Sequence, residues 1–146
     1  MIVVCADKTE DVRSGGSRAW RNDNPGNIEA SDFATDEGAI GAAGGKGNKR
    51  FAVFASEADG TSALGDLLDA KADKGMTLNQ AIADWAPKKE NNTAAYQRAV
   101  QKATGMKGDA RLSKMPPAQR KALMAAIRQH EGWQAGTVTS RPATQQ

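Results

Sequence analysis

Apolar residues recur at helical spacing through most of the second half of the chain. Leu64, Leu67 and Leu68 form a stripe in the first of these segments. Ser56 is followed three residues later by an acid, which resembles a capping box, and Gly75 is suited to end the helix. We therefore expect a helix over residues 57–75.

Three further helices are expected, each between recognisable start and stop signals. Thr77 can cap residues 78–86, which Pro87 ends, and Thr93 can cap residues 94–105. Ser113 and the Pro116–Pro117 pair precede the last segment, residues 118–133. Their expected inward side chains are Leu78, Ile82 and Trp85, then Tyr96, Ala99, Val100 and Ala103, then Leu123, Met124 and Ile127.

A β-hairpin is expected before the helices. Residues 51–54 alternate, with Phe51 and Val53 on one face and Ala52 and Phe54 on the other. A shorter apolar pair, Ala39–Ile40, precedes them, and a glycine-rich stretch separates the two. The predicted fold class is mainly α (α+β), a helical domain with one small β-hairpin.

The two ends of the chain lack such patterns. Residues 1–18 end in a Ser/Gly-rich hinge and are interpreted as a lead-in segment, and residues 137–146 as a polar, flexible tail. Residues 19–136 form the predicted domain. The apolar start, Met1 to Ala6, is too short for a signal peptide. A protein acting outside the cytoplasm then needs another route of delivery, or the chain is a piece of a longer one.

Composition narrows the function classes. The chain has 146 residues, one cysteine and one histidine, which exclude an internal disulfide and a multi-histidine metal site. We expect no metal and no cofactor. No stretch is long and apolar enough for a membrane helix. The net charge of +3 favours polyanionic surfaces such as bacterial cell wall, but the basic residues are scattered, which argues against a nucleic-acid groove.

Residues 21–28, RNDNPGNI, are too polar for a helix or an ordinary strand. Asn and Asp side chains bond to nearby backbone and tolerate left-handed conformations, while Pro25 fixes one φ angle and Gly26 permits an unusual one. The asparagines then either only tie the loop together or present amides to a ligand. Amides that both donate and accept suit sugar hydroxyls and N-acetyl groups.

Glu131 stands out at the end of the last predicted helix, in the sequence HEGW. A carboxyl at a helix C-terminus meets the negative end of the helix dipole, and burial against Trp133 disfavours its ionised form. Both effects raise the pKa of a carboxyl, as a general acid requires. A solvated surface glutamate is the alternative.

Four ordered motifs resemble a family common in phages, prophages and secreted antibacterial effectors. The motifs are RNDNPGNI, RFAVFASEADGTSAL, WAPKKENNTAAY and AIRQHEGW, and the resemblance covers roughly residues 18–135. The family pattern has asparagine where this chain has Asp23, and Lys88–Lys89 fill the spacer before Glu90–Asn91.

A more distant resemblance is to lysozyme-like transglycosylases and glucosaminidases. In those enzymes a helix ending in ESGW carries the catalytic acid, and an asparagine loop and a hairpin follow it. HEGW, NPGNI and FAVFAS are similar to these landmarks, but here the glutamate helix comes last. The resemblance implies a circularly permuted lysozyme-like domain, in which residues 21–28 pack beside residues 127–133.

The resemblance also implies residue roles. Glu131 would protonate the bond between N-acetylmuramic acid and N-acetylglucosamine, and a hydrolase would add a second carboxylate. Candidates for that carboxylate are Glu29, Glu37 and Glu90, with Asp32 and Asp36 behind them; without one, a lytic transglycosylase is expected. The substrate-binding candidates are Arg21, Asn22, Asn24, Asn27, Glu90, Asn91, Tyr96 and Trp133. Arg21 could instead brace the loop through a carboxylate.

Plainer interpretations apply to several of these residues. Trp85 suits the helix core, Tyr96 suits the core and a cleft equally well, and residues 88–93 suit a helix cap ending in Asn92 or Thr93. His130 suits a surface or partly packed position.

The predicted function is a peptidoglycan-cleaving muramidase or lytic transglycosylase. It would be delivered to the periplasm by a phage particle or a secretion system such as type VI, and the resemblance implies a cognate immunity protein as a partner. The alternative is a non-catalytic phage structural or cell-wall-binding module.

Overall fold

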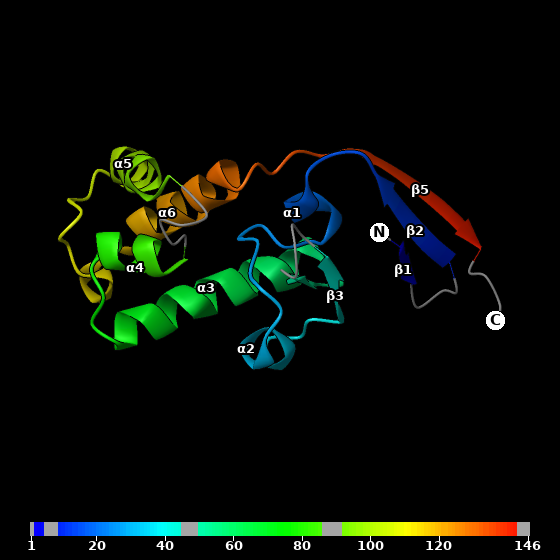
Figure 1. Ribbon diagram of the computed structural model, residues 1–146, viewed down its shortest axis with the longest axis horizontal. Coiled ribbons are helices and arrows are strands. Elements are labelled where there is room, and N and C mark those ends of the chain that lie inside the picture. Colours follow the sequence, from blue (N-terminus) through cyan, green and yellow to red (C-terminus); the bar gives the residue numbers. More distant parts are fainter. Residues whose placement is uncertain (1, 5–8, 45–49, 86–91, 143–146) are drawn as a thin grey trace. The chain divides into compact units, whose positions relative to one another are not determined.

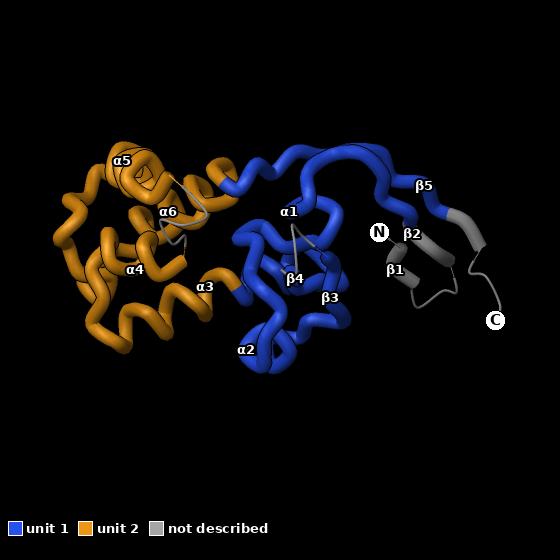
Figure 2. The backbone as a smooth tube through the Cα atoms, viewed as in Figure 1, with its two compact units in different colours: residues 1–63, 131–146 blue, residues 64–130 orange. Residues whose placement is uncertain are grey.

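The computed structural model describes residues 2–4, 9–44, 50–85 and 92–142 (Figure 1). Within these ranges the chain is mainly helical with a smaller β component, so the predicted fold class is confirmed. The chain divides into two compact units, which Figure 2 distinguishes by colour. Unit 1 comprises residues 1–63 and 131–146, and unit 2 comprises residues 64–130. The expected boundaries at residues 18 and 136 do not coincide with this division.

Unit 1 joins the two ends of the chain in one antiparallel sheet. Its strands are β1 (Ile2–Val4), β2 (Thr9–Ser14) and β5 (Thr137–Pro142), in the order β1-β2-β5. The β2–β5 register runs from Thr9↔Pro142 to Ser14↔Thr137. The expected flexible tail at 137–146 is therefore wrong for residues 137–142. β1 and β2 come from the same end of the chain, and the β2–β5 pairing joins the two ends.

A hairpin is confirmed, formed by β3 (Gly41–Gly44) and β4 (Arg50–Val53), with Gly41 opposite Val53. Its first strand is not at Ala39–Ile40, as expected, but lies in the glycine-rich stretch that was expected to be the tip. Residues 45–49 of that expected tip (residues 41–50) lie outside the described residues. Ala52 of β4 also donates its N–H to the carbonyl of Ile28, at 2.9 Å, so the segment after the asparagine loop pairs with the second edge of this strand. β4 is covered on both faces, and Phe51 to Phe54 are all buried.

Unit 1 also contains two short helices that periodicity does not predict. They are α1 (Arg18–Arg21) and α2 (Asp32–Asp36), each opened by a serine that accepts a hydrogen bond from the backbone three residues on. Ser17 caps α1 and Ser31 caps α2. Helices of four and five residues are too short to show a 3.6-residue pattern.

The long helices begin and end largely where their caps indicate. Ser56 Oγ accepts from Asp59 N at 3.1 Å, and Thr77 and Gln80 form a reciprocal capping box. Asn92 rather than Thr93 caps the next helix, which Gly105 ends at φ +70°. The elements are α3 (Glu57–Asp73), α4 (Leu78–Trp85), α5 (Thr93–Thr104), the 3₁₀ turn η1 (Leu112–Lys114) and α6 (Pro117–His130).

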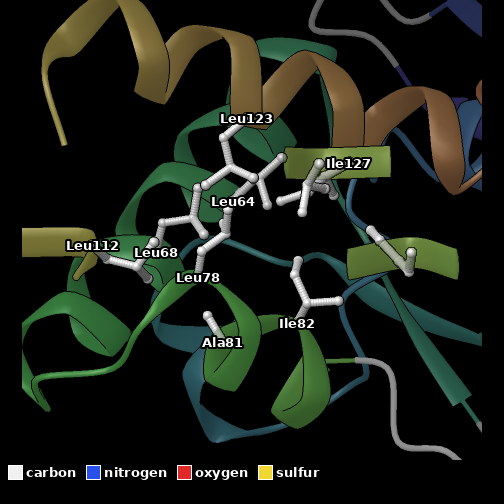
Figure 3. Close-up of a cluster of buried hydrophobic side chains, with 10 residues drawn as sticks. Leu64, Leu68, Leu78, Ala81, Ile82, Leu112, Leu123 and Ile127 are labelled. Atoms are coloured by element: carbon white, nitrogen blue, oxygen red, sulfur yellow. The ribbon is translucent and has the colours of Figure 1, made fainter. Parts of the chain in front are cut away.

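Unit 2 has a continuous apolar core. Side chains from α3, α4, η1 and α6 converge in it, as Figure 3 shows for the labelled residues, and α5 also contributes to it. Each large aliphatic side chain buried in this way stabilises the fold by about 1.5–3 kcal/mol. Ala99 and Ala103 are exposed, so their expected inward positions are wrong, because α5 turns only Tyr96, Val100 and Thr104 inward. The buried members are Leu64, Leu68, Leu78, Ala81, Ile82, Tyr96, Val100, Leu112, Leu123 and Ile127.

Candidate functional site

Residues 131–136 lie against residues 14–17 within unit 1. Ser17 N donates to Gln134 O at 2.9 Å, and Gln134 N donates to Ser17 Oγ at 3.0 Å. The same serine hydroxyl caps α1, immediately before the asparagine loop. One side chain thus connects the segment after α6 to the start of the loop.

Two glycines permit this close approach. A Cβ on Gly16 would lie 2.6 Å from Gln134 O, and a Cβ on Gly136 would lie 2.2 Å from Ser14 O. Gly16 also has a φ of +62°, which disfavours residues with side chains. The glycines that looked like a hinge therefore serve as a contact surface between the two ends of the chain.

Asn24 braces the loop from inside. Its Nδ2 donates to the carbonyls of Ile28 and Ala52, and its Oδ1 accepts from Ile28 N, all at 2.9 Å. The residue is fully buried. The expectation that Asn24 presents its amide to a sugar is wrong, because all these hydrogen bonds point inward and fasten the loop to β4.

The loop turns through two non-glycine residues in the left-handed region. Asp23 has φ +51° and Asn27 has φ +46°. Gly26, which was expected to supply the unusual angle, does not have a positive φ. Asp and Asn tolerate this region better than other residues with side chains, so the strain is modest.

The start of α3 packs closely on this loop. A Cβ on Gly60 would lie 1.8 Å from the Asp23 carbonyl oxygen and 3.0 Å from Pro25 Cδ. Only glycine fits at that position without movement of the backbone.

Asp23 is a buried acid with a cationic partner. Arg13 Nη1 donates to its carboxyl at 2.6 Å, and the same guanidinium lies 4.9 Å from the centroid of the Trp20 ring. Burial raises the pKa of Asp23, Arg13 opposes that rise, and Glu57 and Asp59 add to it. The residue that departs from the family pattern is thus paired inside the protein.

Asn22 and Arg21 also have structural contacts. Asn22 caps the C-terminus of α1 and is 2% exposed, and no described residue bonds its Nδ2. Arg21 Nη1 donates to the carbonyls of Gly15 and Gly16 at 3.0 and 2.7 Å. It braces the loop as expected, but through backbone carbonyls.

Asn27 is the loop residue that reaches Glu131. Its Nδ2 lies 3.4 Å from the carboxyl Oε1 and 3.4 Å from the backbone carbonyl oxygen of Glu131. Both residues are half-buried. The first and last motifs of the sequence therefore meet at these two side chains.

Glu131 directly follows the last residue of α6, His130, and precedes Gly132 with φ +79°. The helix was expected to continue to residue 133, but it ends at His130. The left-handed Gly132 takes the position just beyond the cap, where such residues commonly end helices. The carboxyl therefore lies at the negative end of the helix dipole, as expected.

The candidates for a second carboxylate occupy different places. Glu29 is exposed and forms a β-bridge with Phe51. Glu37 is half-buried and caps the C-terminus of α2, while Asp32 and Asp36 lie exposed at the two ends of that helix. Glu90 and Asn91 lie outside the described residues.

The two aromatic candidates differ in exposure. Tyr96 is fully buried in the core of unit 2 and stacks on His130, with ring centroids 3.7 Å apart. It is therefore a core residue and not a surface for stacking a sugar. Burial lowers the pKa of His130. Trp133 is partly exposed in unit 1, so its role in stacking stays a prediction.

A separate pocket of about 340 Å³ lies between α2 and the β3–β4 hairpin. Small side chains line it, among them Ala30, Ala34, Ala42 and Ala52, beside the exposed Ile40. None of the residues predicted for the site contributes to it.

Arg13, Ser17 and Gly60 are structurally important residues that the sequence reasoning did not single out. An isolated glycine in the first turns of a predicted helix is a signal that could have identified Gly60. Arg13 carries no local signal, because its partner Asp23 comes from another segment. Ser17 caps a helix too short to show periodicity, and its other partner, Gln134, is distant in the chain.

No family model matches the chain, and no curated protein matches it. Among the described residues, no cluster of three or more His, Cys, Asp or Glu is arranged to hold a metal ion. In the same part of the chain, no helix is both long and apolar enough to cross a membrane.

Proposed function

We propose that this protein is a peptidoglycan glycosidase, a muramidase or lytic transglycosylase, in which Glu131 is the general acid. The observation that carries the proposal is the contact between Glu131 and Asn27. It brings the glutamate at the end of α6 beside the asparagine loop. These are the two landmarks that lysozyme-like enzymes place next to each other, here in rotated chain order.

The position of Glu131 suits an acid that must be protonated before it acts. The negative end of the α6 dipole and partial burial both favour the neutral carboxyl. Proton donation to the oxygen of a glycosidic bond requires that form. Cleavage of the bond then proceeds through an oxocarbenium-like sugar.

The fate of that sugar separates the two enzyme classes. In a hydrolase, a second carboxylate activates water or forms a covalent intermediate. Glu29 and Glu37 are the described glutamates among the candidates for this role, with Asp32 and Asp36 behind them. In a transglycosylase, Glu131 alone takes back a proton from the sugar, whose own hydroxyl closes an anhydro ring.

Only part of the predicted binding loop is available for sugars. Asn24 bonds inward and Asn22 is buried, so Trp133 and Arg21 are the more accessible of the predicted contacts. This arrangement favours a site built around Glu131 over a non-catalytic module that binds the wall through the loop amides.

The test is incubation of the purified protein with isolated sacculi, followed by analysis of released muropeptides. Wild type should release them, and Glu131→Gln should lose nearly all release while keeping the fold. Glu57→Gln, at an exposed position in the first turn of α3, is the matched control. Equal release by wild type and Glu131→Gln would refute the site, and binding without release by either would favour the wall-binding alternative.

The remaining parts of the proposal concern delivery. A wall-cleaving enzyme of this kind would reach the periplasm of a target cell through a phage particle or a secretion system. A producing cell would then need an inhibitor protein for protection. Co-purification of such an inhibitor with the protein from its native host would support this part.

A further inference from the structure

We infer that Asn27 is a positioning residue for Glu131, whose amide nitrogen holds the carboxyl in one orientation and favours its ionised form. The catalytic meaning of this inference rests on the proposed function. The contact on which it is built does not.

A single donor faces two acceptors of the same residue. Asn27 Nδ2 lies 3.4 Å both from the carboxyl Oε1 and from the main-chain oxygen of Glu131. It therefore ties the side chain of Glu131 to its own backbone. The distances are at the long end for hydrogen bonds, and such contacts in unliganded sites commonly shorten when substrate binds.

The orientation of the amide is set by its surroundings. Asn27 Oδ1 is buried and finds no hydrogen-bond donor among the described residues. Rotation of the amide by half a turn would place this oxygen against the Glu131 carbonyl, bringing two acceptors together. The nitrogen end is consequently the one that faces Glu131.

Strand β4 holds Asn27 in place through Asn24. Its backbone N–H donates to Asn24 O at 3.0 Å, and the Asn24 side chain is fastened to Ala52. The left-handed φ of Asn27 turns its side chain out of this rigid loop. A chain of contacts thus leads from the sheet to the carboxyl.

The chemical consequence is a balance between two protonation states. The helix end favours the neutral carboxyl, whereas a hydrogen bond donated by Nδ2 favours the carboxylate. A group that first gives a proton and then takes one back must be able to adopt both states. The other ionisable side chains of residues 21–29 and 127–133 are Arg21, the paired Asp23, the exposed Glu29, Arg128 and His130.

Two substitutions separate the amide from the backbone. Asn27→Asp keeps the shape and tolerates the left-handed φ, but replaces the donor with an acceptor that can carry negative charge. Asn27→Gly removes the amide and relaxes the backbone. Asn92→Asp is the matched control, because it adds the same charge at an exposed helix cap where Asp is equally favourable.

The experiment measures the titration of Glu131 directly, by carbon NMR of its carboxyl over a range of pH, in the full chain. Asn27→Asp should raise the titration midpoint by about one pH unit or more, as expected for a like charge at this distance. Asn27→Gly should raise it by a smaller amount, and Asn92→Asp should leave it unchanged. The high-pH limb of muropeptide release should move with the midpoint.

The outcomes distinguish this inference from the proposed function. If the midpoint rises but neither the wild type nor any variant releases muropeptides, the inference stands and the proposed function fails. If wild type releases muropeptides while both substitutions leave the midpoint unchanged, the inference fails. Should Asn27→Asp not fold, Asn27→Gly decides alone, and an unchanged or lowered midpoint in it refutes the inference.

Discussion

The side-chain amide of Asn27 lies 3.4 Å from the carboxyl of Glu131, although 104 positions separate the two residues in the chain. The contact joins the loop that follows α1 to the residue that follows α6. It exists because the two ends of the chain are held together by the β2–β5 pairing and by the Ser17–Gln134 hydrogen bonds.

Loss of the Glu131 carboxyl should abolish catalysis. A general acid typically contributes about 10²- to 10⁴-fold to a rate, so Glu131→Gln should reduce the initial rate of muropeptide release by at least that lower factor. The rate is measured on isolated sacculi, with folding checked by circular dichroism.

Product chemistry and the effect of the second-acid variants should agree. If the muropeptides end in an anhydro sugar, lighter by one water than the hydrolytic product, Glu29→Gln and Glu37→Gln should both retain activity. If they end in a reducing sugar, one of these variants should lose most of it. Mass spectrometry identifies the ends, and anhydro products together with an essential Glu29 or Glu37 would contradict this assignment of roles.

Gly60→Ala should destabilise unit 1 and disturb the asparagine loop. The added Cβ meets the Asp23 carbonyl oxygen at 1.8 Å, so backbone must move, at a cost of about 1–3 kcal/mol in the free energy of unfolding. Urea unfolding followed by tryptophan fluorescence measures the change.

Gly65→Ala is the matched control for that substitution. It lies in the same helix, and its Cβ would meet only flexible side chains, at 3.1 Å from Arg120 Nη2 and 3.7 Å from Met124 Cε. This variant should be neutral or slightly stabilising because alanine favours helix. Equal destabilisation by both variants would show that the Asp23 contact is not the cause.

Asn24→Ala should be among the more damaging substitutions in the loop. It removes three buried hydrogen bonds and leaves backbone groups of Ile28 and Ala52 without this partner. The expected loss is about 2–4 kcal/mol in the free energy of unfolding. The exposed cap Asn92→Ala should cost only about 1 kcal/mol. Comparable losses from the two would contradict the bracing role.

His130 should make stability depend on pH near neutrality. Burial lowers its pKa in the folded protein, so the unfolded chain takes up a proton first as pH falls. The stability contributed by the neutral ring is complete above the ordinary histidine pKa of about 6.5 and is lost as pH falls below it.

His130→Phe keeps a ring to stack on Tyr96 and cannot take up a proton. Its free energy of unfolding should therefore change less between pH 7.5 and 5.5 than that of wild type. Chemical denaturation at several pH values measures the slopes. A wild-type slope of opposite sign, or an unchanged slope in the variant, would contradict this account.

Local patterns were sufficient for the helices of unit 2 and for strand β4 of the hairpin. The stripe containing Leu64 and Leu68, the Thr77–Gln80 capping box and Gly105 each act within a few residues, so their effect is visible in the sequence. Short-range hydrogen bonds and helical periodicity need no distant partner. Asn92 caps α5 instead of Thr93, and the two are adjacent polar residues with similar capping ability.

The directions in which the asparagine side chains point could not be predicted from local sequence. Residue type predicts that Asn24 and Asn27 make hydrogen bonds, but both their partners and their burial depend on where β4 and residue 131 lie. The side chain of Asn24 is therefore buried and bonds to β4, whereas that of Asn27 faces Glu131.

By itself, the sequence determined the longer helices, whose stabilising contacts lie within one or two helical turns, and it identified the residue types from which a site could be built. Only the tertiary structure decided that residues 137–142 form a strand, that Arg13 pairs with Asp23, and that Asn27 contacts Glu131. The physical reason is that these contacts join residues distant in the chain, and their formation depends on the packing of the whole of unit 1.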